Sequence, residues 1–98
     1  MKVIDIVRMD CHGRVTLDGI GIEKWDGVRA VVDLEKEMIE LIDGKKFSYG
    51  KLIYPDQGAR ITIPKWARNE IGDGKDFLLL VDEESGKIFL SPKTGKVL

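Results

Sequence analysis

Two short segments of this 98-residue chain are nearly the same. Residues 10–17 have the sequence DCHGRVTL and residues 56–63 have the sequence DQGARITI, an offset of 46 positions. This near-repeat indicates that one small unit is written twice. A unit of that length lies near the lower limit for an independent hydrophobic core, so we expect the two copies to share one core.

The repeat predicts a single domain over residues 1–98 that is made of two interleaved copies. The first copy, over residues 1–43, is degenerate, and the second, over residues 47–92, is fuller. The polar segment Asp43-Gly44-Lys45-Lys46 joins them.

The two copies differ most just after the repeated segment. In the second copy, residues 64–70 separate Ile63 from the next Ile-Gly pair, whereas only Asp18-Gly19 follows Leu17 in the first. We therefore expect the first copy to lack a helix that the second contains.

Apolar and β-branched runs predict eight short strands. They are expected over residues 3–8, 14–17, 30–33, 38–42, 47–54, 60–63, 77–81 and 87–90. Residues 29–42 contain good helix formers, so a helix is the alternative there. We favour strands because the matching stretch of the second copy, FLLLVDEESGKIFLS, is typical of a hairpin with its turn at Ser85-Gly86.

One short helix is expected within residues 64–72, which begin with proline and end with glycine. At 3.6 residues per turn, Trp66 and Ala67 fall on one side, while Lys65 and Arg68 fall on another. We therefore expect the helix to pack through Trp66 and to present Lys65 and Arg68 to solvent.

The net charge of −1 conceals an uneven distribution. Residues 1–43 carry 6 basic and 10 acidic side chains, whereas residues 44–98 carry 10 basic and 7 acidic ones. Residues 44–68 alone hold 6 basic side chains against a single acidic one, Asp56. This segment predicts either a one-sided anion-binding face or an ordinary solvated surface.

Composition is typical of a cytoplasmic globular protein. The single Cys11 cannot form an intrachain disulfide, which suits a reducing compartment. No apolar run approaches the roughly 18 residues of a membrane span, and the N-terminal residues lack the apolar stretch of a signal peptide. One Asn and one Gln beside many Lys, Glu, Ile and Val residues indicate a thermophilic source.

The order of motifs in the second copy resembles the AbrB/MazE/SpoVT family of DNA-binding domains. GARITIPKWARNEIGDGKDFLLLVDEESGKIFLSP is similar to the family order of a G-x-[VI]-T-[IL]-P-K segment, a short helix with arginine, a Gly-Asp turn and a hairpin. Ala59 departs from this order as an extra residue between Gly58 and Arg60. The first copy matches through DIVRMDCHGRVTLD and through IGIEKWDGVRAVVDLEKEMIEL, so the resemblance covers nearly the whole chain.

The resemblance implies a mainly β fold with one short helix, in which two copies interleave their hairpins into a swapped-hairpin β-barrel. Family members normally take the two copies from two chains. Both copies lie in one chain here, so we expect an intramolecular pseudo-dimer, with a homodimer as the alternative. Interleaving also removes free sheet edges, which a four-stranded copy alone would expose.

The resemblance also implies which residues contact double-stranded DNA. Carried over position by position, the basic contacts fall on Arg8, Arg14, Arg60, Lys65 and Arg68. Such side chains neutralise phosphates and release counterions, and arginine can also fork onto a guanine edge.

The chain departs from the family pattern at two of these places. Tyr54 stands at the second-copy counterpart of Arg8, and the first copy has no counterpart of the basic helix positions. The carboxylates of Asp5, Asp10 and Asp18 are also available to pair with the arginines of the first copy.

These features predict sequence-tolerant DNA binding by an AbrB-like transcriptional regulator. The alternative is a barrel that has lost DNA binding and acts as a protein-interaction module or an antitoxin-like protein. No cofactor, metal site or enzymatic activity is expected: Cys11-His12 lacks the further ligands of a metal site, and no nucleophile or phosphate-binding motif occurs.

Overall fold

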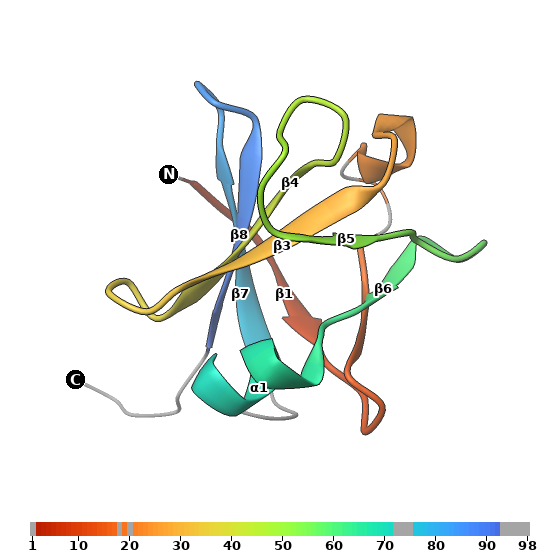
Figure 1. The fold of residues 1–98 in the computed structure, drawn as a ribbon. Coiled ribbons are helices and arrows are strands. Elements are labelled where there is room, and N and C mark those ends of the chain that lie inside the picture. Colours follow the sequence, from red (N-terminus) through yellow and green to blue (C-terminus); the bar gives the residue numbers. More distant parts are fainter. Residues whose placement is uncertain (1, 18, 20, 72–75, 93–98) are drawn as a thin grey trace.

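The computed structural model describes residues 2–17, 19, 21–71 and 76–92, and the fold of this part is mainly β with one short helix (Figure 1). The strands are β1 (Lys2–Arg8), β2 (Arg14–Thr16), β3 (Val28–Asp33), β4 (Met38–Asp43), β5 (Lys51–Ile53), β6 (Arg60–Thr62), β7 (Asp76–Asp82) and β8 (Lys87–Pro92). Helix α1 (Lys65–Ile71) follows β6, and a 3-10 turn, η1 (Ile22–Lys24), precedes β3.

The strands form two antiparallel sheets, and neither is closed. The larger sheet has the order β1-β7-β8-β4-β3-β5, and β2 pairs with β6 in a separate two-stranded ribbon. Among the described strands, only the hairpins β3–β4 and β7–β8 pair strands from the same half of the chain. The pairs β1–β7, β3–β5, β4–β8 and β2–β6 each join residues 1–43 to residues 47–92.

Strand order and register repeat when the two halves are exchanged. Replacing β1, β3 and β4 by β5, β7 and β8, and the reverse, gives the same strand order read backwards. Register agrees at the central pair of strands, where Ile39 lies opposite Leu90 and Leu41 lies opposite Ile88. In Figure 1 the two hairpins cross at this pair, which places the join between the halves in the middle of the molecule.

The hydrophobic core draws on both halves. Its buried members are Met9, Val15, Leu17, Ile22, Val28, Ala30, Ile39, Leu41, Ile61, Ile63, Ala67, Phe77, Leu79, Ile88 and Leu90. Alternate residues of the strands supply most of these side chains, as expected where one face of a sheet is covered.

The hairpin prediction over residues 29–42 is confirmed, and the alternative helix there is wrong. The predicted strand over residues 47–54 is shortened to β5, because the chain turns at Gly50 with φ of 92° close to the backbone of Ala30. The expected helix stop at Gly72 and the Gly-Asp turn that the resemblance implies after it lie outside the described residues.

The first residues of the second half, Phe47 and Tyr49, are held against the sheet by contacts with Lys87. Lys87 Nζ lies 3.0 Å from Glu40 Oε1 and 3.4 Å from the Tyr49 hydroxyl, and 5.4 Å from the centre of the Phe47 ring. The hydrogen bond with Glu40, followed by that with Tyr49, raises the pKa of Lys87. These contacts therefore hold the start of the second half over the central strands.

The helix packs differently from the sequence expectation. Trp66 is 48% exposed, so the prediction that the helix packs through Trp66 is wrong, and Ala67 is the residue that is fully buried. The helix is only seven residues long and lies against β3 and β4. Periodicity gives the angles between side chains, but the close contact at the small Ala67 sets the rotation of the helix about its axis.

Candidate nucleic-acid interface

The β2–β6 ribbon carries both arginines of the repeated segment on its outer face. One side chain from each strand, Val15 and Ile61, is buried beneath the ribbon. Since alternate side chains of a strand point to opposite faces, the outer face is formed by Arg14, Thr16, Arg60 and Thr62. Arg14 lies opposite Thr62 and Thr16 lies opposite Arg60, so the two arginines are about 7 Å apart along the ribbon.

An aspartate four residues earlier holds Arg14. Asp10 Oδ1 accepts hydrogen bonds from the backbone N–H groups of His12 (2.9 Å) and Arg14 (2.8 Å). Asp10 Oδ2 accepts one from Arg14 Nε at 2.7 Å. The carboxylate therefore fixes the turn before β2 and the direction of the guanidinium together.

The second half repeats this arrangement at Arg60. Asp56 Oδ1 accepts from the backbone N–H groups of Gly58 (2.9 Å) and Arg60 (3.1 Å), and Oδ2 accepts from Arg60 Nε at 2.8 Å. Sequence reasoning did not assign these aspartates to the site, although the shared D-x-x-x-R spacing was visible in both copies. The expected pairing of Arg14 with a neighbouring acid is confirmed for Asp10.

The hydrogen bonds to these carboxylates predict a defined acid sensitivity. The Arg14 backbone N–H, with further bonds from its guanidinium and from the His12 N–H, lowers the pKa of Asp10 to about 2. The same kind of bonds, first among them that from the Arg60 N–H, lower the pKa of Asp56. Because both values lie below those of an unfolded chain, the stabilisation is present above about pH 4 and is lost as pH falls towards about 2.

We expect the double variant Asp10→Asn/Asp56→Asn to unfold at lower urea concentration than the parent near neutral pH. The two midpoints should converge only as the pH falls through about 2, where Asp10 of the parent becomes protonated. Urea titrations at both pH values check this. A gap between parent and variant that stays constant down to low pH would contradict the assignment.

The residue before each arginine adopts a left-handed backbone. Gly13 has φ of 80° and Ala59 has φ of 57°, and these residues are 46 positions apart. Asp10–Arg14 and Asp56–Arg60 are therefore turns of equal length, and Ala59 occupies the place of Gly13. The offset of 46 positions without a gap between the two repeated segments therefore holds in the backbone as well.

The same two residues close the ribbon at its ends. The Gly13 carbonyl accepts a hydrogen bond from the Ile63 N–H at 2.9 Å, and the Ala59 carbonyl accepts one from the Leu17 N–H at 2.9 Å. Each turn of one half is therefore bonded to the strand end of the other half.

Arg68 is partly buried, and its side chain lies against the turn of the first half at Gly13. A Cβ atom on Gly13 would lie 2.7 Å from Arg68 Cζ, and the Arg68 Nε atom is buried. The expectation that α1 presents Arg68 to solvent is therefore wrong. The bare backbone of glycine makes room for the guanidinium, so Arg68 fastens α1 to the turn of the first half.

The other two predicted contacts lie outside the ribbon. Lys65 is exposed at the first position of α1, close in sequence to the end of β6. Arg8 lies on the edge strand β1, where its Nε atom is 3.3 Å from Asp76 Oδ1, so it pairs with an aspartate of the second half that sequence reasoning did not assign to it. The fold thus brings Arg14 and Arg60 onto one face and places Lys65 near it.

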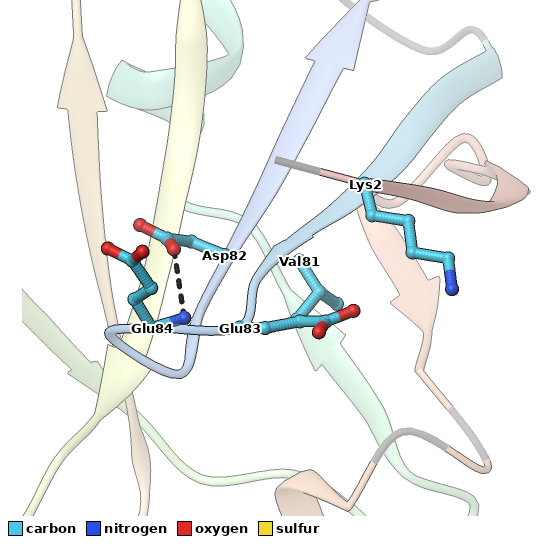
Figure 2. A pocket seen from close by; sticks show the side chains of 5 residues that line it. All are labelled: Lys2, Val81, Asp82, Glu83 and Glu84. Carbon is cyan, nitrogen blue, oxygen red and sulfur yellow. Dashed lines mark hydrogen bonds between the residues drawn. The ribbon is translucent and has the colours of Figure 1, made fainter.

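The turn of the β7–β8 hairpin is acidic, because Asp82, Glu83 and Glu84 lie there. A hollow of about 540 Å³ is lined by Lys2, Val81, Asp82, Glu83 and Glu84, whose side chains are drawn in Figure 2. Asp82 Oδ1 accepts a hydrogen bond from the Glu84 N–H at 3.1 Å. In Figure 1 this turn lies far from α1. We therefore expect an anion to be repelled at this turn and attracted to the arginines of the β2–β6 ribbon.

The described part of the chain was found to hold neither a candidate metal site nor a candidate membrane-spanning helix. Within it, no three His, Cys, Asp or Glu side chains gather closely enough to hold a metal ion. No helix there combines the length and apolar character needed to cross a bilayer.

No protein-family model matches the chain, and no significant match is found among curated proteins or solved structures.

Proposed function

We propose that this protein binds double-stranded DNA, with little sequence preference, as a cytoplasmic transcriptional regulator of AbrB-like type. The observation that carries the proposal is the placement of Arg14 and Arg60 on the outer face of one two-stranded ribbon. The major groove of DNA admits such a ribbon, and arginine bonds both to phosphates and to guanine edges. Lys65, exposed after β6, would add a phosphate contact.

The aspartate pairs are compatible with this role. A guanidinium has five N–H donors, and the bond to aspartate uses Nε, so the terminal nitrogens lie outside that pair. A side chain that is already oriented loses less conformational entropy when it binds. The aspartate pairs also lower the expected affinity for DNA. Each carboxylate offsets one positive charge of the ribbon, so we expect the binding to be weak.

Interleaved strand pairing supports the resemblance to swapped-hairpin domains. Every described strand pair outside the two hairpins joins one half of the chain to the other, and register repeats between the halves. On this proposal the chain is an intramolecular pseudo-dimer that acts as a monomer.

The second candidate is a related fold that has lost DNA binding and recognises a protein. The pairing of Arg8, Arg14 and Arg60 with carboxylates favours it, because a neutralised surface attracts DNA only weakly. It also fits the acidic first half.

Fluorescence anisotropy with a labelled duplex separates the two candidates. We expect the parent to bind at about 50 mM salt and to weaken steeply by about 200 mM. The double variant Arg14→Gln/Arg60→Gln should lose about tenfold or more in affinity at the lower salt, because two cations leave the ribbon face.

Lys45→Gln/Lys46→Gln is the matched control, since it removes the same charge from an exposed turn away from the ribbon. We expect it to retain most of the affinity. Equal losses of affinity in both double variants would mean that binding depends on net charge and not on the ribbon. If the parent does not bind the duplex, DNA is rejected as the partner. Circular dichroism of each variant checks that the fold is kept.

A further inference from the structure

A hollow of about 290 Å³ opens where the two halves of the chain differ. It lies between the turn around η1 and the segment that leaves β5. Its walls include two aromatic rings, a proline ring and two carboxylates, from Trp25, Asp26, Gly27, Tyr54, Pro55 and Asp56.

Several residues that line the hollow differ from their counterparts in the other half of the chain. Arg8 and Met9 in the first half correspond to Tyr54 and Pro55 in the second. Met9 is 3% exposed and fills its place in the core, whereas Pro55 is smaller and lies partly exposed beside the hollow.

The second substitution replaces an ion pair by an aromatic contact. In the register of the sheet, Gly27 corresponds to Asp76, the partner of Arg8. A Cβ atom on Gly27 would lie 3.3 Å from Tyr54 Cε1, so the tyrosine ring lies directly over the glycine backbone. The change removes both charges of the ion pair and adds a ring at the rim of the hollow.

The remaining charges are negative. Asp26 is exposed at the rim, and Asp56 borders the hollow while its oxygens bond the Arg60 turn. Trp25 is partly buried and packed against the core, which fixes one ring, and Tyr54 is 68% exposed, which leaves the other accessible. Aromatic faces attract cations, and quaternary ammonium groups are held by such arrangements.

We propose that this hollow binds a methylated ammonium group. The group belongs either to a small molecule or to a methylated lysine side chain. The volume of about 290 Å³ lies just below the range of about 300–1,000 Å³ for small-molecule sites, which fits a headgroup and not a large ligand. An unmethylated ammonium is more strongly hydrated and gains less on entering an aromatic site. The proposal is independent of DNA binding.

Trp25 fluorescence provides the test. The chain has two tryptophans, so Trp66→Phe leaves Trp25 as the single reporter. Titration of this variant with choline should give a saturable change. The neutral isostere 3,3-dimethyl-1-butanol should give none at the same concentrations, because it has the shape without the charge.

Variants test the assigned walls. In the Trp66→Phe background, Tyr54→Leu should weaken choline binding by about fivefold or more, and Tyr54→Phe should restore it. Tyr49→Leu, at the other exposed tyrosine, is the matched control and should bind as the parent does. Asp26→Asn should weaken binding through loss of charge.

A titration with acetylated trimethyllysine amide distinguishes the sources. Tighter binding than choline indicates a side chain of a partner protein, and weaker binding indicates a small molecule. The proposal is overturned if neither probe saturates, if the neutral isostere binds as well as choline, or if Tyr54→Leu and Tyr49→Leu behave alike.

Discussion

Severing the chain between Lys45 and Lys46 should leave two fragments that do not fold alone. Residues 1–45 retain the hairpin β3–β4 and residues 46–98 retain β7–β8, while the other described strand pairs need both fragments. An isolated hairpin is marginally stable at best in water. We therefore expect far-ultraviolet circular dichroism of each fragment to indicate an unfolded chain, and mixing them to restore the strand signal in a 1:1 complex.

Measuring the mass of each fragment in solution shows whether a folded fragment is a monomer or a dimer. The second fragment has a complete set of repeat elements, so it can associate with another copy of itself that supplies the missing strand partners. A folded monomer of either fragment would contradict interleaving, whereas a folded dimer would agree with it. Severing the turn between Glu84 and Ser85 is the matched control. That cut opens a hairpin within one half, and we expect the two pieces to stay associated.

Gly13→Ala should cost about 2–3 kcal/mol of unfolding free energy, the largest loss we expect from adding a single methyl group. A left-handed backbone costs an L-residue about 1–2 kcal/mol. The rest arises because the new Cβ atom would lie 2.7 Å from Arg68 Cζ, so the partly buried end of the Arg68 side chain must shift. In a domain of this size each kcal/mol lowers the melting temperature by about 4–8 °C. Urea and thermal unfolding measure both quantities.

Ala59→Gly is the counterpart change and should be nearly neutral. Glycine relieves the strain of the left-handed backbone at φ of 57°. This gain is offset because glycine raises the conformational entropy of the unfolded chain, which costs about 0.4–1 kcal/mol of stability. The double variant Gly13→Ala/Arg68→Ala separates strain from collision, because the methyl group then meets no guanidinium. If Gly13→Ala lowers the free energy of unfolding equally in the parent and in the Arg68→Ala background, contact with Arg68 is not the reason why residue 13 is glycine.

The contrast between these two residues explains why they differ in the sequence. Gly13 lies under Arg68 of α1, so only glycine fits both the backbone and the space. Between β2 and β3 the described residues form the 3-10 turn η1 and no α-helix. An alanine is tolerated at residue 59, where the first half provides no corresponding helix.

Strand positions were predictable because their signals are local. β-branched runs and turn residues placed the β3–β4 and β7–β8 hairpins, and the repeat indicated that the two halves share one core. The long predicted strand over residues 47–54 was not predictable in extent, because the turn at Gly50 depends on contact with β3, a distant segment.

The arginines were predictable as residues but not as a site. Five basic positions followed from the resemblance, and nothing local indicated that Arg68 would be partly buried or that Arg8 would pair with Asp76. Periodicity distinguishes the sides of a helix without fixing which side meets the core.

The sequence by itself determined that the chain is built from two related units and where most strands lie, because repeats and local propensities are properties of neighbouring residues. Tertiary structure decided that strands pair across the two halves, that Arg14 and Arg60 share one face, and that a hollow opens beside Tyr54. These features depend on contacts between residues far apart in the chain, which no local pattern encodes.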